Sequence, residues 1–157
     1  MAPEILRRFL VKELPDWLPR CPARRIEQGY LVASGDFEVT LCHSEEKRVL
    51  TMKRCIGDVR DETELPISDV QDQVMWPLTG SLRLAKTRHR VELDEHCLGV
   101  DSFDGPLEGL VVAEVRFESE EESRDFEPPS WLGEEVTGDD RYAGGTLAEL
   151  AAEQATA

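Results

Sequence analysis

Apolar and polar side chains alternate with a period of two residues in most of the apolar segments of this chain. The clearest case is residues 111–117, where Ala113 and Val115 alternate with Glu114 and Arg116. Successive side chains of a strand point to opposite faces of its sheet, so this pattern predicts strands with one buried face. The same alternation is found at residues 4–11, 37–42, 49–53, 60–65 and 98–101.

Helical patterns are few and short. One is expected at residues 68–76, with Ser68 as its N-cap and Pro77 at its end, and another at residues 119–126, where Ser119 and Glu122 have capping-box spacing. A C-terminal helix is expected at about residues 146–155. A length of 157 residues fits one domain. The sequence therefore predicts a single α+β domain, residues 1–157, dominated by an antiparallel sheet.

The second face of these predicted strands is charged, and two interpretations are open. In the first interpretation, the charged face is exposed to water, as in an ordinary antiparallel sheet. Alternatively, the sheet closes into a barrel with charged residues in its lumen and apolar residues outside, under helices.

Composition excludes several classes of function. The chain has 33 Asp and Glu against 18 Lys and Arg, a net charge of −15, whereas nucleic-acid binding needs clustered positive charge. No apolar run reaches the length of a membrane span, and the N-terminus lacks the pattern of a secretory signal. The four cysteines show no C-x-x-C spacing, so reduced thiols and a cytoplasmic location are expected.

Eight blocks of sequence carry a resemblance to a known family. In order, they are 4–11 (EILRRFLV), 28–31 (QGYL), 50–53 (LTMK), 60–64 (RDETE), 76–77 with 86–89 (WP, KTRH), 101–107 (DSFDGPL), 113–115 (AEV) and 133–137 with 141–142 (GEEVT, RY). Together they resemble the signature of the CYTH family, the triphosphate tunnel metalloenzymes.

The resemblance implies an antiparallel eight-stranded β-barrel tunnel with a few short helices packed outside. Members typically hydrolyse tripolyphosphate or thiamine triphosphate, and some cyclise ATP. Inward Lys and Arg hold the phosphoryl oxygens, and inward carboxylates hold Mg²⁺ or Mn²⁺. On this basis the expected catalytic residues are Glu62, Glu64, Asp101 and Glu114. The expected ligand-binding residues are Arg8, Thr40, Cys42, Lys53, Arg60, Lys86, Arg88 and Arg116. The expected metal ligands are Glu4, Asp101 and Glu114.

Departures from the family pattern fall on the lumen positions. Leu6, Gly99 and Arg116 stand where the family has carboxylates, and Thr40 and Cys42 stand where it has the arginines of an R-x-R pair. A cation beside a metal site repels the ion. Arg116 is therefore interpreted as the partner of Glu114, with a role as a ligand anchor as the alternative. The other charges either bind a ligand or only pair with one another inside the lumen.

Three hypotheses about function follow from this combination of retained and substituted residues. The favoured hypothesis is a repurposed tunnel that binds a small molecule, or also transforms it without metal, with triphosphate hydrolysis weak or lost and no cofactor. The first alternative is a triphosphatase that depends on Mg²⁺ or Mn²⁺. The second is a non-catalytic module that binds a nucleotide or phosphate ester. The expected partner is a small molecule in the tunnel, with no nucleic acid and no membrane, in a monomer or a homodimer.

Overall fold

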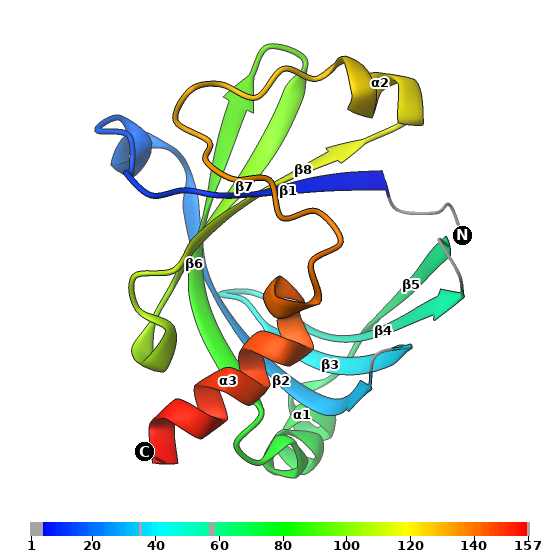
Figure 1. Ribbon diagram of the computed structural model, residues 1–157. Coiled ribbons are helices and arrows are strands. Elements are labelled where there is room, and N and C mark those ends of the chain that lie inside the picture. Colours follow the sequence, from blue (N-terminus) through cyan, green and yellow to red (C-terminus); the bar gives the residue numbers. More distant parts are fainter. Residues whose placement is uncertain (1–4, 35, 57–58, 157) are drawn as a thin grey trace.

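One curled, antiparallel, eight-stranded sheet forms the molecule (Figure 1). The computed structural model describes residues 5–34, 36–56 and 59–156. The strands are β1 (Ile5–Leu10), β2 (Ala23–Ser34), β3 (Phe37–His43), β4 (Arg48–Ile56), β5 (Val59–Pro66), β6 (Arg83–Leu93), β7 (His96–Phe103) and β8 (Val111–Phe117). Their spatial order is β1-β8-β7-β6-β2-β3-β4-β5. The sheet curls into a half-barrel with β1 and β5 as its edges, which confirms the predicted fold class.

The pairing register puts the charged residues on one face. In β3 and β4, Thr40 pairs with Thr51, and Cys42 pairs with Val49. In β1 and β8, Arg8 pairs with Glu114. Leu41 is fully buried, whereas its neighbour Cys42 lines the concave side. The alternation therefore predicted the two faces correctly.

A hydrophobic cluster covers the convex side of β1, β7 and β8. It contains Phe9, Val115 and Phe117, on the strand face opposite the charged one, together with Phe126 and Leu132 from the segment after β8. The rings of Phe9 and Phe126 lie 6.3 Å apart, which is within the range for aromatic packing. This segment includes α2 (Glu120–Asp125), so the chain after β8 packs onto the outside of the sheet.

The C-terminal helix α3 (Gly144–Thr156) covers the opposite, concave side. Leu147 of this helix joins a cluster with Tyr30, Leu84, Phe103 and Val112, all of which also line the concave side. All helices were expected to pack outside the sheet, and for α3 this expectation was wrong. The reason is that the inward faces of β2, β6 and β7 turn apolar at one end, and α3 buries them there.

The remaining helices are short. They are α1 (Asp69–Met75) and the 3₁₀ turns at Leu18–Arg20, Trp76–Thr79, Gly105–Leu107 and Asp140–Tyr142. At α2, Ser119 caps the Glu122 N–H as predicted, but the Glu122 carboxylate accepts from the Glu118 N–H rather than from Ser119. Within the described residues, no helix combines the length and the apolar character needed to cross a membrane.

The cap of α1 gives a first test of the fold. The Ser68 hydroxyl accepts a hydrogen bond from the Gln71 N–H at 3.1 Å, and the Gln71 side chain accepts one from the Ser68 N–H at 2.9 Å. A Ser68→Ala variant is expected to lower the free energy of unfolding by about 1 kcal/mol, as measured by urea unfolding. The control is Ser81→Ala, in a turn, with an expected change below about 0.5 kcal/mol. Equal losses in the two variants would contradict this role of the cap.

Candidate functional site

The concave side of the sheet holds a cavity of about 280 Å³. Its lining includes eleven of the residues predicted to face the lumen, namely Arg8, Thr40, Cys42, Lys53, Glu62, Glu64, Lys86, Arg88, Asp101, Glu114 and Arg116. Leu6, also expected there, is not among the lining residues. Glu4 and the side chain of Arg60 lie outside the described part of the chain. The structure thus brings the predicted charged residues of six strands to one space, while their roles stay predictions.

Asp101 is the most strongly held carboxylate of the cavity. It is 5% exposed, and it accepts hydrogen bonds from Arg88 Nε at 2.6 Å and Arg88 Nη2 at 2.8 Å. Lys86 Nζ lies 3.0 Å from its second oxygen. Burial alone would raise the pKa of Asp101, but these two cations outweigh burial and hold its pKa at about 2. Both carboxylate oxygens are therefore engaged.

Glu114 lies between two arginines. Arg8 Nε is 3.5 Å from one of its oxygens, and Arg116 Nε is 3.3 Å from the other. Burial opposes ionisation, but the charges of Arg88, Arg8 and Arg116 lower the pKa of Glu114 below its usual value. The pair between Arg116 and Glu114 was expected from the sequence. These contacts keep Glu114 ionised and neutralised.

Gly99 allows Arg88 to take its position. A Cβ added to Gly99 would lie 3.1 Å from Arg88 Nε and 3.3 Å from Arg88 Cζ. The Arg88 guanidinium therefore lies over Gly99, at a position where the resemblance implied a carboxylate side chain. Because Gly99 is the Cα partner of Glu114, a cation occupies the space beside that residue.

The two walls of the cavity differ in charge. Among the described residues, the wall from β1, β8, β7, β6 and β2 carries five cations and two carboxylates, an excess of three positive charges. These residues, which we call the cationic wall, are Arg8, Arg24, Lys86, Arg88, Arg116, Asp101 and Glu114. The wall from β3, β4 and β5 carries Lys53 with Glu38, Glu62 and Glu64, an excess of two negative charges. A polyanion would therefore be held against the first wall.

Several charged side chains of the lining form no ion pair within the described residues. Lys53, Glu62 and Glu64 have no oppositely charged group within 4.0 Å there, and the same is true of Arg24. For Glu62 and Glu64, the alternative of a pairing network that only satisfies buried groups finds no support in these contacts. The roles of these side chains toward a ligand stay predictions.

Polar uncharged groups complete the lining. Thr40 is buried, and burial raises the pKa of the Cys42 thiol. The thiol therefore stays protonated at neutral pH. Neither side chain is charged at neutral pH, so this part of the cavity is neutral.

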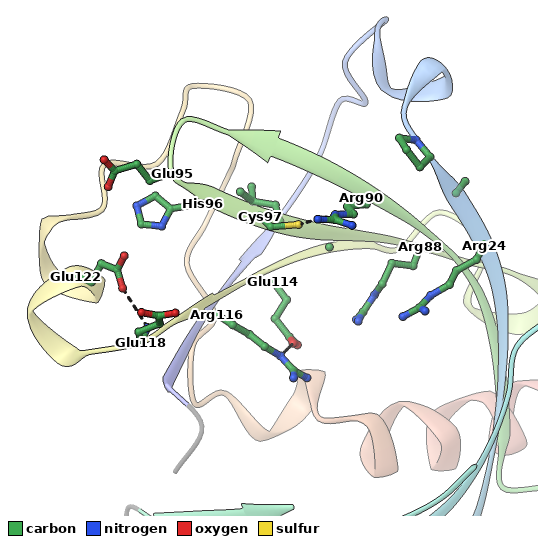
Figure 2. Close-up of a pocket in the computed structure, with 14 residues that line it drawn as sticks. Arg24, Arg88, Arg90, Glu95, His96, Cys97, Glu114, Arg116, Glu118 and Glu122 are labelled. Carbon is green, nitrogen blue, oxygen red and sulfur yellow. Dashed lines mark hydrogen bonds and ion pairs between the residues drawn. The ribbon is translucent and has the colours of Figure 1, made fainter. Parts of the chain in front are cut away.

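A larger pocket of about 640 Å³ adjoins the cavity (Figure 2). The two spaces share Arg24, Arg88, Glu114 and Arg116 in their linings. Figure 2 shows Arg24 and Arg88 side by side, as expected for Cα partners of β2 and β6. Arg24 was missed from the sequence because β2 shows no simple alternation. One feature of the sequence could have indicated it. Arg24 lies four residues before Gln28, so the two side chains share one face of the strand, and both line the cavity.

The metal implied by the family pattern does not fit Asp101 and Glu114. Each carboxylate already pairs with two cations, and a divalent ion would have to displace them. Two like charges at 4 Å repel by about 4 kcal/mol at an effective dielectric constant of 20. Among the described residues, no three His, Cys, Asp or Glu side chains are arranged to hold a metal ion. Glu4 lies outside the described residues, so this test concerns Asp101 and Glu114.

Comparisons with known proteins agree with this architecture. No family model matches the sequence. The chain is 40% identical to an inorganic triphosphatase of Nitrosomonas europaea over 148 residues, which cover 92% of this chain and 96% of that protein. It is 32% identical to an inorganic triphosphatase of Acetivibrio thermocellus over 123 residues, covering 76% and 77% of the two chains.

Solved structures show the same similarity. A crystal structure of an inorganic triphosphatase, 36% identical, matches with a TM-score of 0.71 and covers 94% of this chain and 95% of the other. A conserved hypothetical protein from Pyrococcus furiosus, 20% identical, shares the fold with a TM-score of 0.59 and covers 77% of this chain and 84% of its own. With the curled eight-stranded sheet and its charged concave face, these relatives show that the chain belongs to the CYTH family of triphosphate tunnel proteins.

Proposed function

We propose that the chain is a phosphohydrolase that binds a chain of phosphates, as in inorganic triphosphate, in the cavity of about 280 Å³. The observation that carries the proposal is the cationic wall, whose described residues have an excess of three positive charges. The similarity to two inorganic triphosphatases supports it. This was the alternative on sequence grounds, and the relatives favour it over a repurposed tunnel.

The proposed roles follow from charge and pairing. Guanidinium and ammonium groups of the cationic wall hold the phosphoryl oxygens, and the planar fork of arginine suits two oxygens at once. Glu62 and Glu64 on the opposite wall form no ion pair within the described residues. One of them orients the attacking water and accepts its proton.

The test is phosphate release from tripolyphosphate, measured in the presence of Mg²⁺ or Mn²⁺ and, in parallel, in EDTA. Because Asp101 and Glu114 are held by cations, we expect slow turnover, below the ordinary enzymatic range of roughly 1 to 10³ s⁻¹. A Glu62→Gln/Glu64→Gln double variant is expected to lower the rate by about 10²-fold or more. The matched control is Arg54→Gln, on the outer face of β4, with an unchanged rate. Release no faster than in a blank would contradict the proposal.

A second candidate is the repurposed tunnel, which binds a different small molecule. The adjoining pocket of about 640 Å³ and the neutral Thr40 and Cys42 favour it, because they leave room for a ligand larger than triphosphate. A thermal shift with a phosphate ester or a nucleotide, but none with tripolyphosphate, would favour this candidate.

The proposal also includes a cytoplasmic location and a small-molecule ligand. It rests on the absence of C-x-x-C spacing among the four cysteines and on the net charge of −15, which disfavours nucleic acid.

A further inference from the structure

The carboxylates of the cationic wall are already neutralised by side chains of the chain itself. Asp101 accepts three contacts of 2.6 to 3.0 Å from Arg88 and Lys86. Glu114 has Arg8 and Arg116 on its two oxygens, at 3.5 and 3.3 Å. Carboxylates bind hard divalent ions only when their oxygens are available. On this wall, that requirement is not met.

A guanidinium also takes up space beside these carboxylates. Arg88 lies over Gly99, where a Cβ would come within 3.1 to 3.3 Å of its side chain. Arg116 extends from β8 next to Glu114 (Figure 2). A positive charge is thus built into the wall, close to where a metal ion would otherwise supply one.

The positive charge exceeds what the two carboxylates need. Among the described residues of the wall, five cations face two carboxylates, and Arg24 has no ion pair with any of these residues. Charge-assisted hydrogen bonds from guanidinium to phosphate are short and strong, and they need no bridging ion. The wall therefore offers a phosphate chain both positive charge and directed donors.

We infer that the cavity binds the phosphate chain as a free anion, with arginine and lysine side chains in the role of the divalent ion. This inference rests on the proposed function, since it concerns how the same cavity holds the same class of ligand. Mg²⁺ complexes triphosphate in solution and lowers its charge. Magnesium therefore competes with the wall for the ligand and weakens binding.

Titration calorimetry with tripolyphosphate tests the inference. In EDTA, at fixed ionic strength, tripolyphosphate is expected to bind to the full-length protein. With Mg²⁺ in excess over tripolyphosphate, the affinity is expected to fall by about tenfold or more, since the ligand loses charge-assisted contacts. Binding that needs Mg²⁺, or that is stronger with it, would overturn the inference and leave the proposed function intact. Absence of binding in both conditions would refute the proposed function, and the inference with it.

A pair of variants separates the wall from general charge effects. Arg116→Gln removes one cation of the wall, and because its side chain is 57% exposed, the variant should still fold. Its affinity for tripolyphosphate in EDTA is expected to fall by about tenfold or more. The control, Arg54→Gln, removes one cation from the outer face of β4, where Arg54 pairs with Asp61, and its affinity is expected to stay within about twofold. Equal losses would show that only net charge matters, which would refute direct binding by the wall.

Discussion

An Asp101→Asn variant is expected to lose about 3 kcal/mol of its free energy of unfolding, or about 6 to 12 °C in melting temperature. Asp101 is 5% exposed, and it is the shared partner of Arg88 and Lys86. Removing its charge leaves two cations close together without compensation. Burial already lowers the pKa of Lys86, so the loss of Asp101 further disfavours its charged form.

The effect is expected to depend on pH with a definite sign. The pKa of Asp101 is about 2 in the folded protein and about 3.9 in an unfolded chain. A lowered pKa stabilises the fold while the carboxylate is ionised. This contribution, about 2 to 3 kcal/mol, is present above about pH 4 and is lost as the pH falls towards 2. The difference between parent and variant should therefore shrink in acid.

Urea unfolding at pH 7 and at several values down to pH 3 measures both effects. The matched control is Asp104→Asn, which breaks the exposed pair with Arg25. Surface ion pairs contribute little, so a loss below about 1 kcal/mol is expected there. A similar, small loss in both variants would mean that Asp101 does not hold the cationic wall together.

The face on which each residue lies was predictable, because period two is a property of any strand. Cys42 and Leu41 illustrate this, since one lines the cavity and the other is fully buried. The pair of Arg116 with Glu114 was also predictable, because residues two apart on a strand share a face. The occurrence of the family blocks in order predicted the fold as a whole.

Partners across strands were not predictable from the pattern. Asp101 meets Arg88 because β6 and β7 pair in a register that makes these two residues Cα partners. The alternation predicts only that Asp101 and Arg88 both face inward. The turn between the two strands sets this register, and its effect on the pairing became visible only in the structure.

The alternation in the sequence did not predict β2 and β6, and the reason is physical. Their inward residues change character along each strand. Arg24 and Arg88 line the cavity, whereas Tyr30 and Leu84 are covered by α3. One face is thus polar at one end and apolar at the other, which removes the period from the sequence. The position of α3 inside the half-barrel was missed for the same reason.

The second large effect is expected for Arg116→Glu, which introduces the carboxylate that the resemblance implied at this position. The change removes the 3.3 Å ion pair with Glu114 and places a second carboxylate on the same face of β8. Because Arg116 is 57% exposed, solvent screens the repulsion, and a loss of up to about 1 kcal/mol without metal is expected. The same change supplies oxygen ligands for a hard divalent ion.

Mn²⁺ is therefore expected to stabilise the Arg116→Glu variant and to leave the parent unchanged. An ion that binds only the folded state, at 100 times its dissociation constant, adds about 2.7 kcal/mol, which corresponds to about 5 to 11 °C. Melting curves with Mn²⁺ and with EDTA measure this, and the charge-matched control is Arg54→Glu on the outer face of β4. If the position-116 variant melts like the parent and ignores Mn²⁺, Arg116 does not lie where the family holds its ion. The guanidinium would then pair with carboxylates without standing in for an ion, and the positive charge of the wall would come from Arg8, Arg24, Lys86 and Arg88.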